Sequence, residues 1–393
     1  MRKKNIIFFL PSELYDGAES LVTLKFMRLL GKNNNVYLIY RCKKTDFIQE
    51  DPLQIRQYCK GIPLFFPGKI GSLEWSIRAF LHAWRICRRN KFDVIISRIM
   101  PIFGHLPALF LHFFTKIPWC ANWSDPYPQI TAPAPYGDGR AAKIPFWQKK
   151  FCQLMVNSAN CHTFPSERLL ELYQFFFPKL VGKSFVIPHV MFDSASRTCV
   201  GENSALELVY AGSGLAFRQP EIIVDAIEKT RIAFRGDLKI HVTFYGEIYL
   251  PLKRRIEESS CKHYFTLAGK VSYSQTIECI KKADLALLLE APCNVGVFLS
   301  SKLLDYLQCG KPIFAISPNI GVMADLIHNF GGGVLADCAS PNDISIKLQE
   351  IYSDWIADRL KSPRYDTSRL REYFSESHVL SQWNVISRFL SKE

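Results

Sequence analysis

Short apolar segments alternate with longer amphipathic ones along the whole chain. Uninterrupted apolar runs occupy residues 6–10, 36–40 and 94–96, and similar runs return in the second half at residues 285–289 and 312–316. The segments between them repeat apolar residues at helical spacing. Strands that are apolar throughout, rather than at every second position, indicate a parallel sheet covered on both faces. The pattern therefore predicts an α/β fold built from strand–helix units.

The alternation stops once and then restarts. Residues 190–206, "VMFDSASRTCVGENSAL", are small and polar, and they are the best candidate for a linker. A chain of 393 residues is also long for a single core. We therefore expect two doubly wound parallel-sheet domains in series, over residues 1–190 and 205–374. Ligands of such sheets bind at the carboxyl ends of the strands, and the cleft between the domains is the expected site.

One predicted helix in the first half, residues 73–89, has both large apolar and basic side chains. We expect the apolar set to face the core and the arginines to face solvent. The apolar set is Ile77, Phe80, Leu81, Trp84 and Cys87, and the arginines are Arg78, Arg85 and Arg88.

Charge divides the chain more sharply than hydropathy does. The net charge is +13, and residues 1–200 carry 27 Lys and Arg against 13 Asp and Glu, whereas residues 201–393 carry 22 against 23. The first half should therefore meet an anionic partner, such as a membrane surface, a lipid diphosphate or a nucleic acid. The 12 cysteines are scattered without metal-ligand spacing, which indicates reduced thiols in the cytosol. The basic start followed by a six-residue apolar run is interpreted as a first buried strand, not a signal peptide.

Residues 300–312, "SSKLLDYLQCGKP", predict a short helix that ends at a glycine and a proline. Its leucines share one side, whereas the other side holds Lys302, Asp305, Tyr306 and Cys309. Because a buried strand precedes this helix, its N-terminus should lie at the ligand edge of the sheet. The amides near Ser301, together with Lys302, would bind an anion there, and Asp305 would accept hydrogen bonds from a ribose. A solvated Lys–Asp pair is the alternative.

A glycine-containing loop follows another predicted strand in "YAGSGLAFRQPE". Gly212, Ser213 and Gly214 would let the backbone approach a phosphate closely, and Arg218 follows them. A tight turn uses the same residues, so this signal is weak when taken alone.

A third loop ends the strand in "FTLAGKV". The exposed backbone at Lys270 and Val271 could pair with the edge of a nucleobase. A plain strand-to-helix turn explains these residues equally well.

The first half offers fewer candidates. Asp125, in "ANWSDPYP", ends a strand and could orient or deprotonate a sugar hydroxyl, although an aspartate before a proline also suits a turn. Gly17 would approach a diphosphate, or would simply open a helix. His162 lies near a strand end and is the second catalytic candidate. His189 is interpreted as a structural histidine.

Other chemistries lack their motifs. The sequence has no Asp-x-Asp pair for a nucleotide-bound divalent ion, no Walker loop, no nucleophile elbow and no zinc motif. We therefore expect no metal site, and the charge of a leaving diphosphate would be neutralised by amides, Arg and Lys.

Several of these segments together resemble one large family. "SSKLLDYLQCGKPIFAI" resembles the nucleotide-sugar-binding segment of the retaining GT-B glycosyltransferases (group 1 type), which build bacterial surface polysaccharides. "VYAGSG", "FYGE", "LAGKVSYSQTIECIKKADLALLL" and "PWCANWSDPYP" fall in the family's order. The resemblance covers nearly the whole chain and is most specific over residues 206–340. It implies a GT-B fold of two Rossmann-like domains facing a cleft, with the acceptor bound by the first, the donor by the second, and a C-terminal helix, residues 375–393, crossing back to the first.

The resemblance also assigns roles residue by residue. It implies that Asp305 holds the donor ribose and that Arg218 contacts the diphosphate. The first acid of the family's Glu-x7-Glu motif is replaced by Val297 in this chain. The family's usual earlier arginine is also absent, because its position lies near Ser213. Lys302 would replace that arginine. Asp125 lies where many relatives carry a histidine.

We therefore expect an enzyme, a glycosyltransferase that moves a sugar from a nucleoside-diphosphate sugar to a glycan, lipid-linked, in the synthesis of a bacterial surface polysaccharide such as lipopolysaccharide or capsule. By resemblance it retains configuration, and it needs no cofactor besides the nucleotide-sugar substrate. The basic first half favours an anionic membrane surface as a partner, and aromatic and basic residues of the helix region 73–89 are a candidate dock. We expect a cytoplasmic protein, peripheral on the inner face of the cytoplasmic membrane, and no nucleic-acid partner because no such motif is present. A nucleotide-sugar epimerase of the same fold and a non-catalytic nucleotide-sugar or glycan-binding subunit are the alternatives.

Overall fold

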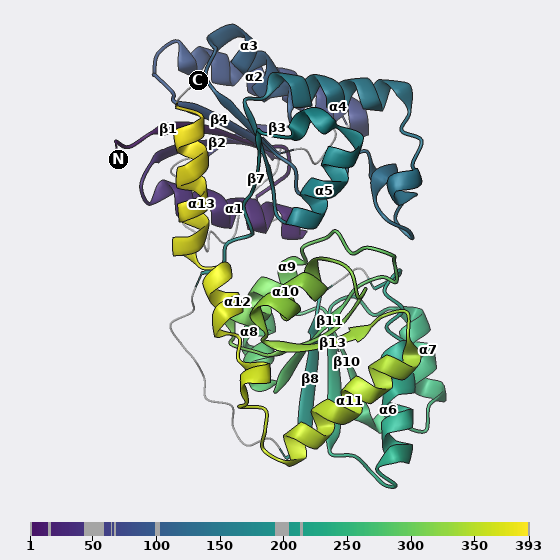
Figure 1. Cartoon of the computed structure of the whole chain (residues 1–393). Coiled ribbons are helices and arrows are strands. Elements are labelled where there is room, and N and C mark those ends of the chain that lie inside the picture. The colour runs from purple at the N-terminus through teal and green to yellow at the C-terminus, as the bar shows by residue number, and fades with distance from the viewer. Residues whose placement is uncertain are drawn as a thin grey trace. The chain divides into compact units, whose positions relative to one another are not determined.

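The chain forms two compact units, each considered separately (Figure 1). The computed structural model describes residues 2–14, 17–42, 59–63, 65–66, 68–98, 103–192, 204–212 and 215–391. The N-terminal unit comprises Met1–Ala132, Asp138–Val190 and Ser375–Glu393, and the C-terminal unit comprises Pro133–Gly137 and Met191–Phe374. Most of the expected linker, residues 193–203, lies outside the described residues.

Within the described part of the N-terminal unit, seven parallel strands form one sheet in the order β3-β2-β1-β4-β5-β6-β7. These strands are β1 (Asn5–Leu10), β2 (Asn35–Cys42), β3 (Cys59–Pro63), β4 (Val94–Arg98), β5 (Trp119–Asn122), β6 (Cys161–Phe164) and β7 (Ser184–Val186). The helices of this unit are α1 (Gly17–Gly31), α2 (Gly68–Cys87), α3 (Leu106–Thr115), α4 (Phe146–Ser158), α5 (Glu167–Phe176) and α13 (Glu376–Phe389). Strands β1 and β4 are almost wholly buried, as the apolar runs predict.

Helix α13 belongs to the N-terminal unit although the chain reaches it after the C-terminal unit (Figure 1). The Trp383 ring packs edge-on against Phe26 of α1, with ring centroids 5.9 Å apart. Phe389 packs in the same way against Phe185 of β7 at 5.2 Å. The Lys4 Nζ donates to the backbone oxygen of Ser387 at 2.8 Å. The last helix therefore completes the packing of the first sheet.

The described part of the C-terminal unit holds six parallel strands in the order β10-β9-β8-β11-β12-β13. They are β8 (Leu206–Ala211), β9 (Ile240–Tyr245), β10 (Phe265–Gly269), β11 (Leu285–Leu289), β12 (Ile313–Ser317) and β13 (Gly333–Asp337). The helices are α6 (Ile222–Ala233), α7 (Leu250–Glu258), α8 (Tyr273–Lys282), α9 (Ser301–Gln308), α10 (Val322–Phe330), α11 (Pro341–Ile356) and α12 (Ser368–Tyr373).

Helices cover both faces of this second sheet. Leu287 of β11 belongs to a buried cluster with Ile223 of α6. The next residue, Leu288, belongs to a second cluster with Ile277 of α8. Neighbouring residues of one strand thus point into two different cores, which explains why the strand is apolar at every position. The prediction of two doubly wound α/β domains is confirmed.

The expectation for helix α2 is wrong. Its buried residues are mostly small, and they are Gly71, Ser72, Trp75, Ser76, Ala79 and Ala83. The residues expected in the core, including Ile77, Leu81 and Trp84, are exposed. Small side chains let the helix backbone lie close to its neighbours, and the Ser76 Oγ donates to the backbone oxygen of Phe103 at 2.9 Å. Because the spacing of an apolar stripe is the same whether it faces in or out, periodicity alone could not distinguish the two.

Candidate functional site

The strand order of the C-terminal unit reverses between β8 and β11. Strands β9 and β10 follow β8 outward on one side, and β12 and β13 follow β11 on the other. Residues Leu208 and Val209 of β8 pair with Leu285 and Ala286, at the start of β11. Open α/β sheets bind ligands at the carboxyl edge beside such a reversal. This edge is the starting point for the candidate site.

Tyr306 of α9 bridges the two strands at the reversal. Its hydroxyl accepts a hydrogen bond from the backbone N–H of Ala211 at 3.0 Å and donates one to the backbone oxygen of Leu287 at 3.1 Å. The side chain is 0% exposed, so the expectation that it lies on the polar face of the helix is wrong. A tyrosine can be buried here because both hydrogen-bonding capacities of its hydroxyl are satisfied. The bridge holds α9 against the ends of β8 and β11.

Lys302 lies one turn before Tyr306 and crosses the end of β8. Its Nζ is 5.6 Å from the centre of the Tyr210 ring. A Cβ placed on Gly212, whose φ is 144°, would lie 1.8 Å from the Lys302 Cε. Because glycine has no Cβ, this position leaves space for the Lys302 side chain to cross the end of β8. The remaining residues of this predicted loop, Ser213 and Gly214, lie outside the described residues.

A second cation approaches the same strand end. The Arg218 Nη1 donates to the Tyr210 hydroxyl at 3.2 Å. Burial, followed by the positive charge of Arg218, lowers the pKa of Lys302 to about 7, while Asp305 acts in the opposite direction. A bound anion would relieve this repulsion, because it would favour the charged form of the lysine. The pair suits a phosphate or diphosphate group at the end of β8.

Asp305 lies one turn after Lys302 on α9. Its Oδ1 accepts a hydrogen bond of 2.8 Å from the hydroxyl of Tyr273, the first residue of α8. Ser301 opens α9 and is partly buried. A partly exposed aspartate held by a phenol hydroxyl can accept hydrogen bonds from a ligand diol. Tyr273 could not be linked to Asp305 from the sequence, because the two residues lie 32 positions apart.

Lys270 and Val271 are exposed in the loop from β10 to α8. The Ser272 side chain accepts from the Gln275 backbone, and the Gln275 side chain accepts from the Ser272 backbone, which together fix the start of α8. The loop therefore presents these two residues near Tyr273, at the carboxyl edge of the sheet.

A carboxylate that the sequence analysis left out of its site also lies at the reversal. Glu290 directly follows β11, and its Oε2 accepts a hydrogen bond of 2.6 Å from the Ser317 hydroxyl. Burial raises the pKa of Glu290, and the Ser317 hydrogen bond and then the charge of Arg218 oppose that rise. Val297, which occupies the position of the other acid of the family's motif, is apolar and buried. Glu290 could have been predicted as a site residue from the sequence, because it directly follows the buried strand in "DLALLLE".

The N-terminal unit brings a different group of charges to its own carboxyl edge. Arg98, at the end of β4, donates to both carboxylate oxygens of Glu19 in the first turn of α1, from Nε to Oε1 at 2.6 Å and from Nη2 to Oε2 at 3.1 Å. The Ser124 hydroxyl donates to the same Oε1 at 2.5 Å. Gly17, with a φ of 76°, opens α1 and is exposed. Glu19 and Arg98 were not predicted as site residues, because they come from segments far apart in the chain.

Asp125 follows Ser124 and lies beside this ion pair. Burial, and then the negative charge of Glu19, raises the pKa of Asp125 to about 6, while Arg98 acts in the opposite direction. The Tyr173 hydroxyl donates to the backbone oxygen of Asp125 at 2.9 Å, which fixes the loop. A carboxyl with such a pKa can accept a proton near neutral pH.

His162 does not fit the catalytic role expected for it. It is 0% exposed, and its Nδ1 accepts a hydrogen bond from the Trp123 Nε1 at 3.0 Å. Its Nε2 lies 3.2 Å from the backbone oxygen of Val156, to which it donates. Burial, and then the charge of Lys183, lowers the pKa of His162 to about 3. Both ring nitrogens are used internally, so the structure argues for a packing role.

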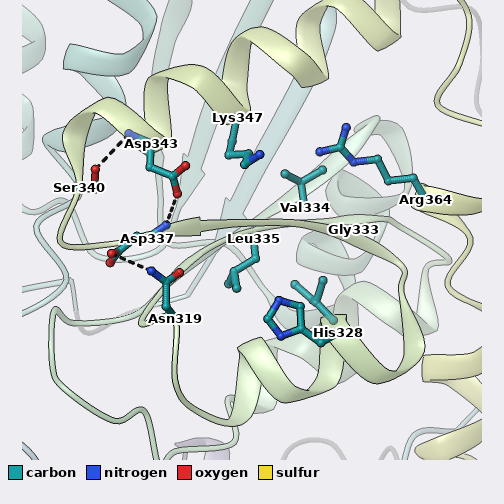
Figure 2. Close-up of a pocket in the computed structure, with 11 residues that line it drawn as sticks. Asn319, His328, Gly333, Val334, Leu335, Asp337, Ser340, Asp343, Lys347 and Arg364 are labelled. Atoms are coloured by element: carbon teal, nitrogen blue, oxygen red, sulfur yellow. Dashed lines mark hydrogen bonds between the residues drawn. The ribbon is translucent and has the colours of Figure 1, made fainter.

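A separate surface depression of about 570 Å³ lies along β13, at the outer edge of the second sheet (Figure 2). Its cations are already paired, since Lys347 and Arg364 both contact Glu350, at 2.9 and 2.6 Å. The Asp343 carboxylate accepts from the backbone N–H of Asp337. The Asp343 contact stabilises the end of β13, the ion pairs join Glu350 of α11 to its neighbours, and the groove lies away from the reversal between β8 and β11.

No group of three or more His, Cys, Asp or Glu side chains among the described residues has the arrangement of a metal site. Likewise, none of the helices that the structure describes combines the length and apolar character needed to cross a bilayer.

Comparisons with known proteins identify the fold. No family model and no curated protein matches the sequence. A glycosyltransferase from Rickettsia africae matches the structure with a TM-score of 0.71 at 14% identity, over 100% of both chains. The pneumococcal O-GlcNAc transferase GtfA, solved with UDP and GlcNAc, matches with 0.68 at 11% identity, also over 100% of both chains. A UDP-N-acetylglucosamine 2-epimerase from Listeria monocytogenes, described as putative, matches with 0.60 at 9%, over 100% of this chain and 98% of that chain. The chain therefore has the GT-B fold, as its sequence predicts.

Proposed function

We propose that this protein is a retaining glycosyltransferase that uses a nucleoside-diphosphate sugar as donor. The observation that carries the proposal is the pair of cations, Lys302 and Arg218, at the strand reversal of the C-terminal unit. Two partly buried positive charges beside a glycine with a φ of 144° suit a diphosphate. Solved proteins of the same fold carry UDP, including GtfA and a TarM variant from S. aureus, and their likeness supports the donor class.

The donor would bind through three contacts in the C-terminal unit. Its diphosphate would lie against the Gly212 backbone, Lys302 and Arg218, close to the start of α9 at Ser301. Asp305, oriented by Tyr273, would accept hydrogen bonds from the ribose hydroxyls. The loop at Lys270 and Val271 would contact the base.

In the reaction, the bond between the anomeric carbon and the diphosphate oxygen breaks. The acceptor hydroxyl oxygen forms the new bond on the same face of the sugar, and its proton is released. Lys302 and Arg218 would neutralise the charge that develops on the leaving diphosphate. The Asp125 carboxyl would orient or deprotonate the acceptor hydroxyl. This assignment needs no metal ion at the chemistry.

The acceptor would be a lipid-linked glycan in the synthesis of a bacterial surface polysaccharide, such as lipopolysaccharide or capsule. The positive charge of residues 1–200 supports an acceptor presented on the anionic inner face of the cytoplasmic membrane. The likeness to the lipopolysaccharide galactosyltransferase WaaB, with a TM-score of 0.61 at 13% identity, supports the same setting.

Thermal stabilisation by nucleotides tests the donor site. Melting temperatures of the wild type and of Lys302→Met would be compared with UDP, GDP, ADP, CMP and dTDP, each with and without EDTA. A ligand at a hundredfold over its dissociation constant adds about 2.7 kcal/mol of stability, which is a measurable shift. Lys262→Met is the matched control, because Lys262 is exposed in the same unit.

The proposal expects stabilisation by one diphosphate that EDTA does not remove and that Lys302→Met alone abolishes. No stabilisation by any nucleotide would overturn it. With the donor identified, release of the nucleoside diphosphate that depends on an added membrane extract as the source of acceptor would report transfer. Conversion of the donor alone to its epimer would instead favour an epimerase, and binding without turnover would favour a non-catalytic subunit.

A further inference from the structure

Helix α2 carries its large apolar residues on the outside. Ile70, Ile77, Leu81 and Trp84 follow one another at three-, four- and seven-residue steps, so they share one face of the helix. Ile70 is 69% exposed and Ile77 is 46% exposed, whereas the inward face consists mostly of Gly, Ala and Ser. A helix whose apolar face points to solvent needs another apolar phase to cover it.

Helix α3 extends this apolar surface. The Phe80 ring of α2 lies 5.7 Å from both Phe110 and Phe114 of α3, centre to centre, and Trp84 lies 6.3 Å from Phe114. Phe113 and Phe114 are 63% and 60% exposed. The two helices lie side by side on one side of the N-terminal unit (Figure 1). We call the surface of Ile77, Leu81, Trp84, Phe110, Phe113 and Phe114 the α2–α3 face.

Cations border the α2–α3 face. The Arg88 guanidinium lies 5.9 Å from the centre of the Trp84 ring, and the Lys116 Nζ lies 5.0 Å from that of Phe113. Residues 65–92 hold six Lys and Arg but a single acidic residue, Glu74. Glu74 is already engaged by Arg78 at 3.1 Å and by two backbone N–H groups. The border of the face therefore carries a strong net positive charge.

We propose that the α2–α3 face docks the protein onto an anionic lipid bilayer. Exposed Trp, Phe and Leu flanked by Arg and Lys fit the boundary between acyl chains and anionic headgroups. The 20 residues of α2 span about 30 Å, so the helix would lie in the plane of the surface. An apolar protein partner would leave the surrounding cations without countercharge, which favours the bilayer as the occupant.

The docking proposal goes beyond the proposed transfer reaction. No residue of the α2–α3 face belongs to the candidate donor site, and lipid binding can be measured without any sugar. Failure of either proposal is therefore distinguishable from failure of the other.

Vesicle co-sedimentation of the full chain tests the proposal. Vesicles of phosphatidylcholine alone would be compared with vesicles that also contain phosphatidylglycerol at about one part in three, at low and at high salt. The apolar variant is Trp84→Gln with Phe113→Gln and Phe114→Gln. The charge variant is Arg85→Glu with Arg88→Glu and Lys116→Glu.

Matched controls remove exposed residues of the C-terminal unit. Ile232→Gln with Ile356→Gln controls the apolar variant, and Lys253→Glu with Lys262→Glu and Lys361→Glu controls the charge variant. Circular dichroism and a cooperative thermal unfolding transition of each variant confirm that it is folded.

The wild type is expected to bind the anionic vesicles, to bind the neutral ones weakly, and to be released by salt. Each basic residue near the surface contributes about 1 kcal/mol, so the charge variant should bind on the order of a hundredfold more weakly. The apolar variant should also lose binding, while both controls retain it. Equal binding to neutral vesicles, equal binding by a variant, or no binding at low salt would overturn the proposal. So would a wild-type dimer that the apolar variant dissociates, because the face would then bind a second copy.

Discussion

The hydroxyl of Tyr273 donates a hydrogen bond of 2.8 Å to the Oδ1 of Asp305. Tyr273 is the first residue of α8, and Asp305 lies in the second turn of α9. The bond therefore joins these two helices at the carboxyl edge of the second sheet. It fixes the orientation of the carboxylate that is proposed to receive the donor ribose.

Asp305→Asn should weaken the binding of UDP, or of whichever nucleoside diphosphate the protein prefers, by about tenfold to a hundredfold. The reason is that the ribose hydroxyls lose a charged hydrogen-bond acceptor. Tyr273→Phe removes only the orienting bond and should cost about fivefold, equivalent to about 1 kcal/mol. Calorimetric dissociation constants would measure both. Unchanged affinity in Asp305→Asn would contradict the assignment of the ribose.

Lys302 predicts a pH-dependent nucleotide affinity. Its pKa of about 7 means that the lysine is mostly neutral near pH 8 in the free protein, and a bound diphosphate would raise that pKa. Binding near pH 8 should therefore take up close to one proton, and affinity should fall as the pH rises further. Calorimetry in two buffers of different ionisation enthalpy measures the uptake. Lys302→Met should abolish the uptake, and uptake that persists in this variant would assign it to another group.

Asp125 predicts a pH-dependent stability. Its folded pKa of about 6 lies above the unfolded value of about 3.9, so the folded state binds more protons between these values. This carboxyl therefore destabilises the fold increasingly as the pH rises through that window. Asp125→Asn should be more stable than the wild type by about 2 kcal/mol near pH 8 and by little near pH 4. Denaturant titrations measure the difference. The exposed Asp138→Asn should show no such dependence, and a flat profile in Asp125→Asn would refute the prediction.

Gly212→Ala should lower both stability and nucleotide affinity. The new Cβ would lie 1.8 Å from the Lys302 Cε, at a φ of 144° that alanine rarely adopts. The cost should be about 1–3 kcal/mol. Gly236→Ala is the control, since the nearest atom to its Cβ is 4.0 Å away. Combining Gly212→Ala with Lys302→Ala should recover part of the stability, and the double-mutant cycle measures that coupling. Purely additive losses would show that the lysine is not displaced.

His162→Leu tests the packing role of this residue. It leaves the Trp123 Nε1 and the Val156 backbone oxygen without their partner, and should reduce stability by about 2–4 kcal/mol. Turnover per folded molecule should stay close to that of the wild type. A loss of turnover without a loss of stability would instead indicate a catalytic role for His162.

The strand pattern of the chain sufficed to predict the fold, because a strand buried on both faces is apolar at every position. Gly212, Lys302 and Asp305 could be placed at one sheet edge because each follows a strand or opens the next helix. Tyr306 was misplaced because its partners are backbone groups of two strands, which no side-chain pattern reports. Glu19 and Arg98 were missed for a related reason, since 79 positions separate them and only the folded sheet brings them together.

The packing of α13 has a consequence for how the protein is made. Trp383 and Phe389 pack on Phe26 and Phe185, yet the ribosome synthesises them after the entire C-terminal unit. The N-terminal unit emerges before the C-terminal unit, but it lacks one of its covering helices until the C-terminal unit has been synthesised. During that interval its apolar surface under α13 is open to chaperones and proteases, so the first unit to be synthesised is the last to be completed.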